Sequence, residues 1–200
     1  MIPSGTRPKF TDVLAAAFWA GVGGLYLALL ARQPSANYVA LGVYNLLIAV
    51  LFAVRRPSRV SSSPVLFVLA SAATLLPMLA LSPAPGGFPG AGLVIQLYGL
   101  GGAVISQLSL GRSFGMAPAH RGIVAGGAYD FVRHPLYLAE LVNLLGYLVA
   151  QPSAWNALVI AVLLLAQVTR IVAEERLLSR DPLYRIYRSQ VRWRLVPGVW

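Results

Sequence analysis

The sequence predicts an all-α protein, a multi-pass transmembrane helix bundle that forms a single membrane domain over residues 1–200. Of the 200 residues, 58% are hydrophobic and only 11% are charged, and the mean hydropathy is +0.70. Soluble domains are far less apolar, and charged residues make up about a quarter of their sequence. Apolar segments of roughly 17 to 20 residues, a length that crosses a bilayer core, recur between short loops.

Six apolar segments are expected to cross the membrane, and four of them form an N-terminal region within residues 13–110. The rest of the chain, residues 111–200, contains a loop, a helical hairpin and a basic tail, and is expected to be the catalytic half. The fifth segment is short and contains Glu140 and Asn143, so five spans remain an alternative. The glycines around Gly99 indicate close helix packing, because no βαβ unit accompanies them. The expected spans are 13–31, 36–54, 65–81, 91–110, 136–150 and 154–173.

The basic residues indicate the orientation in the membrane. The chain has 16 Lys and Arg against 6 Asp and Glu, a formal net charge of +10. If the N-terminus is cytoplasmic, every basic residue except Arg32 lies on the cytoplasmic side, as the positive-inside rule requires. We expect an integral protein of a prokaryotic cell membrane with both termini cytoplasmic. In so apolar a chain the positive charge indicates loops facing anionic lipid, and no nucleic-acid partner is expected.

The absence of cysteine excludes several classes of chemistry. A disulfide framework, thiolate catalysis, iron–sulfur clusters and cysteine zinc sites all require this residue. No metal partner is expected.

The richest group of polar residues lies where the loop enters the fifth segment. Arg133 and His134 precede Pro135, which suits the first turn of a helix and leaves His134 at the N-cap position. Free N–H groups at this helix start, with Arg133 beside them, favour an anion such as a carboxylate or phosphate. An arginine that reaches the lipid headgroups beside a capping histidine explains the residues equally well.

A second cluster, Arg170, Glu174 and Glu175, ends the sixth segment. Arg170 and Glu174 are four residues apart, so they share a helix face and can pair as an ordinary interfacial salt bridge. Two adjacent carboxylates near the hydrocarbon are costly unless cations or hydrogen-bond donors meet them, and a sulfonium, an amine or ribose hydroxyls would serve. Glu140 is either a buried functional group or an interfacial one in water. His120 is expected to be a loop residue without a partner.

The string from Gly127 to Tyr137, the hairpin, the Glu174-Glu175 pair and the Tyr- and Arg-rich tail together resemble the isoprenylcysteine carboxyl methyltransferase and phospholipid methyltransferase superfamily of membrane enzymes. The resemblance covers about residues 111–197. It implies an S-adenosylmethionine pocket that opens to the cytoplasm, while an amphiphilic or apolar acceptor arrives through the bilayer. The cofactor-binding residues that it implies are Arg121, Gly122, Ile123, Val124, Tyr129, His134, Pro135, Leu136, Tyr137 and Glu174.

The candidate catalytic residues are Arg170, Arg133 and Glu175. By the resemblance, Arg170 falls where carboxyl-methylating members hold the acceptor. A lipid-like or isoprenylcysteine-like acceptor with a carboxylate is favoured, whereas an amine would need a base such as Glu175 or His134. S-adenosylmethionine-dependent methyl transfer at the cytoplasmic face is thus expected. The alternatives are a membrane sterol-type reductase with a nicotinamide cofactor, and a non-enzymatic small transporter or lipid-binding scaffold.

Overall fold

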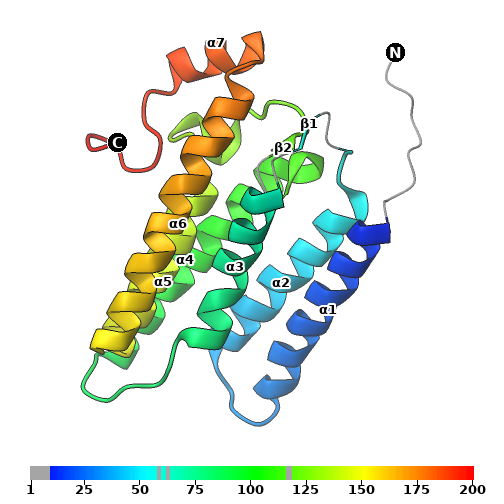
Figure 1. Ribbon diagram of the computed structural model, residues 1–200. Coiled ribbons are helices and arrows are strands. Elements are labelled where there is room, and N and C mark those ends of the chain that lie inside the picture. The colour runs from blue at the N-terminus through cyan, green and yellow to red at the C-terminus, as the bar shows by residue number, and fades with distance from the viewer. Residues whose placement is uncertain (1–9, 58–59, 62–63, 116–118) are drawn as a thin grey trace.

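The protein is described by a computed structural model that covers residues 10–57, 60–61, 64–115 and 119–200. Six helices run up and down side by side as a bundle, and a seventh lies across one end (Figure 1). The helices are α1 (Phe10–Leu30), α2 (Ala36–Val54), α3 (Pro64–Ala80), α4 (Pro89–Leu110), α5 (Pro135–Ala150), α6 (Ala154–Leu178) and α7 (Pro182–Gln190). The short elements are the strands β1 (Val60–Ser61) and β2 (Ala119–His120) and the 3-10 turns η1 (Gly111–Ser113) and η2 (Gly127–Asp130).

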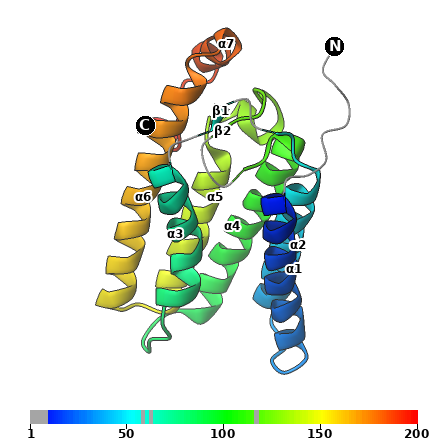
Figure 2. The same cartoon turned by 45° about the vertical axis from the view of Figure 1, so that its right-hand side comes forward.

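The predicted helix bundle is observed, and its apolar helices are consistent with a membrane protein. Helices α1, α2, α4 and α6 are long and apolar enough to cross a membrane. Helix α5 is apolar but has 16 residues, which at 1.5 Å each span only about 24 Å of a hydrocarbon core about 30 Å thick. Helices α3 and α5 nevertheless run beside the longer helices (Figure 2). The count of six spans therefore stays a prediction.

Helix α6 differs from the sequence prediction at its end. It continues to Leu178 instead of ending at residue 173, so Glu174 and Glu175 are helical. The helix stops where the backbone N–H of Ser179 donates to the carbonyl of Glu175 at 2.9 Å. A hydropathy pattern ends at the first polar residues, but the backbone hydrogen bonds that define a helix do not depend on side-chain polarity. The extension keeps both glutamates on the ordered end of α6.

Glycines bring α4 and α5 into close contact. A Cβ on Gly99 would lie 2.4 Å from the backbone nitrogen of Asn143, and one on Gly146 would lie 2.6 Å from the backbone nitrogen of Gln96. Helix backbones come this close where small residues leave room. The predicted packing role is thus confirmed for Gly99, whereas a Cβ on Gly101 would meet nothing within 4 Å.

The end of the bundle that carries α7 is closed by the chain between α4 and α5. Strand β2 pairs antiparallel with β1, and its His120 lies opposite Val60. The buried His120 ring lies 2.7 Å from the carboxylate of Asp181, which also caps α7 by accepting from the N–H of Leu183. The prediction of a partnerless loop histidine was therefore wrong. Its partner is distant in sequence and belongs to no local pattern.

Labelling of single cysteines tests the predicted crossings, since the chain has no cysteine of its own. Gln33 lies in the exposed turn between α1 and α2, and Gln190 is the exposed end of α7, at the opposite end of the bundle (Figure 1). We expect a membrane-impermeant maleimide to label Gln33→Cys in intact cells and Gln190→Cys only after permeabilisation. Labelling of both in intact cells would contradict an even number of crossings with the basic end inside.

Candidate active site

A polar cavity lies between the six-helix bundle and the loops that close it. It encloses about 700 Å³ of unfilled space including its mouth, and its walls come from helices α2 to α6 and the loop after α4. The residues predicted for the site that line this cavity are Arg121, Tyr129, His134, Leu136, Tyr137, Arg170 and Glu174.

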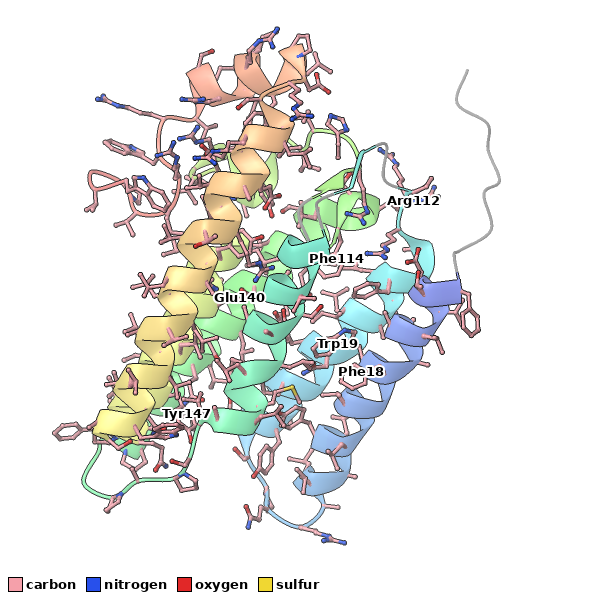
Figure 3. The ribbon with its side chains drawn as sticks, in the orientation of Figure 1. Phe18, Trp19, Arg112, Phe114, Glu140 and Tyr147 are labelled. Atoms are coloured by element: carbon pink, nitrogen blue, oxygen red, sulfur yellow. The ribbon has the colours of Figure 1, made fainter. Side chains whose placement is uncertain are left out.

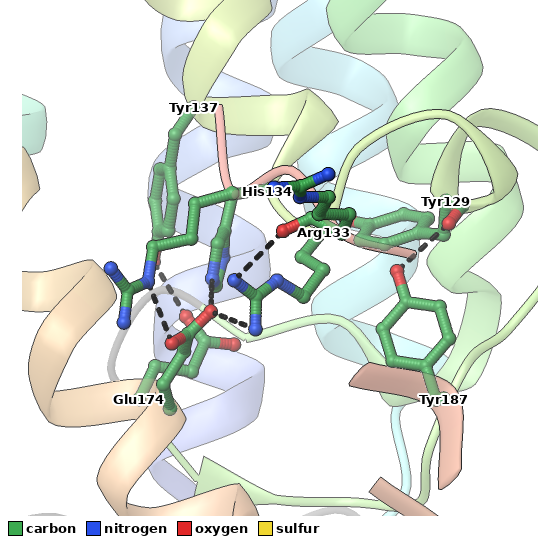
Figure 4. Close-up of polar contacts among 9 residues, drawn as sticks. Tyr129, Arg133, His134, Tyr137, Glu174 and Tyr187 are labelled. Carbon is green, nitrogen blue, oxygen red and sulfur yellow. Dashed lines mark hydrogen bonds and ion pairs between the residues drawn. The ribbon is translucent and has the colours of Figure 1, made fainter. Parts of the chain in front are cut away.

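Side chains from α5 and α6 form one polar wall of the cavity (Figure 4). The Tyr137 hydroxyl donates to Glu174 Oε2 at 3.0 Å. The guanidinium of Arg170 lies 4.8 Å from the centre of the Tyr137 ring, and the His134 ring is stacked on that ring at 5.6 Å. Arg170 and Glu174 both line the cavity, as their four-residue spacing predicts. The wall therefore offers a carboxylate, a phenol and a guanidinium to one small ligand.

Glu175 and Arg133 do not line the cavity but meet in a buried ion cluster beside it. Glu175 Oε1 lies 3.1 Å from Arg133 Nη1 and 3.4 Å from His134 Nε2. Its Oε2 accepts a hydrogen bond from Arg194 Nε at 2.9 Å. Glu175 is 4% exposed, His134 5% and Arg133 7%. The structure thus brings these predicted catalytic residues together, but with each other as partners.

The C-terminal tail occupies the helix start that the sequence suggested for an anion. The backbone N–H groups of Arg133 and His134 donate to the carbonyls of Trp193 and Arg194, both at 2.9 Å. His134 stands at the N-cap of α5 as predicted, but its side chain makes no capping hydrogen bond. This contact between the tail and the start of α5 was not predicted from the sequence. The only sign of the contact in the sequence is that the tail is basic.

The loop arginine Arg121 brings positive charge to the cavity from the side opposite the helices. Burial and the neighbouring Arg55 lower the pKa of Arg121 to about 10. Its Nε has no hydrogen-bond partner among the residues that the structure describes. A cation held in this way is stabilised by an anion beside it. The Arg121 side of the cavity therefore suits a carboxylate or a similar group.

Four residues predicted to bind the cofactor do not line the cavity. Gly122 has a φ of +108°, which side-chain-bearing residues rarely adopt. Ile123 and Val124 pack on the buried cluster that contains Tyr129. Pro135 lies on a different surface, in a groove between α4 and α5.

Helix α7 holds this loop in place through tyrosines. Tyr184 and Tyr187 of α7 pack against Tyr129, and the Tyr187 hydroxyl donates to the carbonyl of Tyr129 at 2.8 Å. Burial raises the pKa of all three phenols. Helix α7 thereby fixes the loop that carries Tyr129 over the cavity.

A second cavity lies deeper in the bundle and shares residues with the first. It has about 760 Å³ of unfilled space, and all six bundle helices contribute to its mainly apolar walls. Tyr44, Thr74 and Glu140 line both cavities. Glu140 Oε1 accepts from the Tyr44 hydroxyl at 3.3 Å, and Oε2 accepts from Gln167 Nε2 at 2.9 Å. Of the two alternatives for Glu140, the interior position is therefore correct (Figure 3).

Comparison with known families identifies the part of the chain that builds the polar cavity. The family described as phospholipid methyltransferase matches residues 90–185. The match contains the loop, α5, α6 and nearly all of α4, and it confirms the predicted resemblance to this superfamily of membrane methyltransferases. The similarity of this region to the family points to membrane methyltransferase activity. No match is found among curated proteins.

Removing the carboxylate of Glu175 tests whether the ion cluster holds the site together. Glu175→Ala leaves Arg133 buried without its counter-ion, and breaking such a pair costs about 3–5 kcal/mol. We expect a clearly lower midpoint of thermal unfolding for the detergent-purified variant, followed by tryptophan fluorescence. Asp130→Asn removes the same charge at an exposed position and should unfold like the wild type. Equal midpoints for Glu175→Ala and the wild type would contradict a structural role for the cluster.

Proposed function

We propose that the protein is an S-adenosylmethionine-dependent methyltransferase that acts on an amphiphilic acceptor at the cytoplasmic face of a prokaryotic cell membrane. The observation that carries this proposal is the pair of adjoining cavities. The polar cavity, built largely by the family-matched residues, suits a charged cofactor, and the apolar cavity suits a lipid-like chain. Both termini are proposed to be cytoplasmic, because the end of the bundle with most basic residues then faces the cytoplasm.

The polar cavity fits the chemistry of S-adenosylmethionine. Its lining includes Gln107, which is 0% exposed and whose amide nitrogen and oxygen both lack hydrogen-bond partners among the described residues. An unpaired buried polar group costs about 1–3 kcal/mol, so this position favours a ligand that offers a donor and an acceptor. Arg121 suits the carboxylate of the cofactor, and Glu174 suits its ribose hydroxyls. When bound, the cofactor supplies an electrophilic methyl group on a sulfonium.

The residues of the site then divide into contacting and positioning groups. We assign support of the lining to Gly122, Ile123, Val124 and Pro135, and cofactor contact to Arg121, Tyr129, His134, Leu136, Tyr137 and Glu174. Arg170 orients the acceptor as a catalytic residue. Arg133 and Glu175 act as positioning residues, because they hold the His134 end of α5 against α6. Methyl transfer requires nucleophile, methyl and sulfur in line, so such positioning supplies much of the rate.

The charge of the lining argues against a nicotinamide dinucleotide. Arg121 and Arg170 are matched in the described lining by the carboxylates of Glu140 and Glu174. A dinucleotide brings a pyrophosphate, which requires a surplus of cationic or N–H donors.

A transporter would place its ionisable residues near the bilayer midplane, whereas here they gather toward one end of the bundle.

Titration calorimetry of the detergent-purified protein tests the cofactor. We expect S-adenosylmethionine and S-adenosylhomocysteine to bind and a nicotinamide dinucleotide not to bind. Glu174→Gln removes a charged acceptor worth about 1.5–3 kcal/mol, which is roughly a 10- to 100-fold loss of affinity for S-adenosylhomocysteine. Asp130→Asn, the exposed charge control, should bind like the wild type. Binding of the dinucleotide alone, or no binding by folded protein, would overturn the proposal.

A further inference from the structure

We propose that the inner cavity binds an acceptor whose apolar chain ends in a head group with a dissociable proton, an amine, hydroxyl or thiol, and that Glu140 takes this proton during methyl transfer. The inference rests on the proposed function and adds the residue that takes the proton of the acceptor. This acceptor differs from the carboxylate acceptor that the sequence favours.

The lining of the inner cavity sets the orientation of an amphiphile. Side chains such as Trp19, Leu100 and Leu163 make most of its surface apolar. Asn45 and Asn143 also line it, but each donates its amide to a helix carbonyl. The carboxylate of the inner cavity comes from Glu140, at the border with the polar cavity. A chain in this cavity therefore directs its head group to Glu140 and to the methyl donor beyond it.

The polar atoms at this border are hydrogen-bond acceptors that can each accept a further hydrogen bond. Both oxygens of Glu140 accept one hydrogen bond each, from Tyr44 and from Gln167, and each oxygen has a further lone pair. Gln167 also lines the inner cavity and is 4% exposed, and its Oε1 has no donor among the described residues. A head group with N–H, O–H or S–H satisfies these acceptors. A carboxylate supplies no proton and carries the same charge as Glu140.

Arg170 does not reverse this preference. Its guanidinium interacts electrostatically with Glu140 and with Glu174, so one positive charge is shared between two carboxylates. These three groups already sum to a charge of −1, and a third carboxylate bound there would make it −2 in a largely apolar surrounding, which is unfavourable. A neutral or protonated head group avoids this cost and can donate a hydrogen bond to Glu140.

The reaction balances with Glu140 as the base. The bond between the sulfonium sulfur and the methyl carbon breaks, and its electron pair stays on sulfur. A lone pair on the nitrogen, oxygen or sulfur of the head group forms the new bond to the methyl carbon. The proton of the head group passes to a carboxylate oxygen of Glu140 and from there to water.

Glu140→Gln is a suitable variant because its hydrogen bonds can be kept. The new amide oxygen still accepts from Tyr44, and its NH₂ group can donate to Gln167 once the Gln167 amide turns over and presents its unpaired Oε1. The substitution therefore removes the negative charge and the proton acceptor while the fold is retained. Gln167→Met is a second variant, which removes the buried acceptor Oε1 and leaves the charge.

The experiment compares octylamine, octane-1-thiol and octanoate as probes for the purified protein. Calorimetry in the presence of S-adenosylhomocysteine measures their binding, and transfer from labelled S-adenosylmethionine measures turnover. We expect the wild type to bind octylamine more tightly than octanoate and to methylate the amine or the thiol. Glu140→Gln should weaken octylamine binding by about tenfold or more and abolish transfer, with Gln167→Met weakening binding less. Affinity for S-adenosylhomocysteine should not change, and Asp130→Asn should match the wild type throughout.

Other results would overturn the inference and separate it from the proposed function. Tighter binding and methylation of octanoate would make the acceptor a carboxylate held by Arg170, and the proposed methyltransferase function would stand. Full transfer to octylamine by Glu140→Gln would exclude Glu140 as the base. Failure of the wild type to bind S-adenosylhomocysteine would instead overturn the proposed function itself.

Discussion

The carboxylate of Glu175 is the point on which the arrangement of the site depends. A charge at the end of a membrane helix is costly unless it is paired and hydrogen-bonded. Glu175 meets Arg133 and His134 from the start of α5 and Arg194 from the tail, so one side chain joins three segments. Tyr137 lies one turn after His134, and its position in the cavity wall follows from this junction.

The two adjacent glutamates have different environments because of helix geometry. With 3.6 residues per turn, neighbouring side chains point roughly 100° apart. Glu174 therefore lines the cavity and accepts from Tyr137, while Glu175 lies in the ion cluster. One carboxylate is thus left for a ligand because the other neutralises the charges that hold the wall. The pair that looked like a single motif in the sequence has a ligand-facing and a structural member.

Local sequence patterns predict the helices of the fold. The features that the sequence did not predict depend on contacts between residues far apart in the chain. Apolar length alone located the six bundle helices, and the glycines around Gly99 indicated a close helix contact, whose partner α5 is known from the structure. The end of α6 was misplaced because hydropathy does not report backbone hydrogen bonds. The pairing of His120 with Asp181 and that of Glu140 with Tyr44 join residues far apart in the chain, which no periodicity encodes. For the same reason the sequence could name Glu140 as a candidate but could not place it between two cavities.

The polar residues inside the bundle are better explained by ligands than by stability. An apolar side chain in place of Gln107 would leave no amide without a hydrogen-bond partner. An apolar side chain in place of Glu140 would not need the hydrogen bonds that Tyr44 and Gln167 donate to the carboxylate. Each such group costs free energy in the ligand-free protein. A ligand that satisfies them recovers this energy on binding, so the groups favour the bound state over the free one. Gln107 in the polar cavity and Gln167 at the border of the apolar one are therefore the two separate places where we propose that a ligand completes the hydrogen bonding of the bundle.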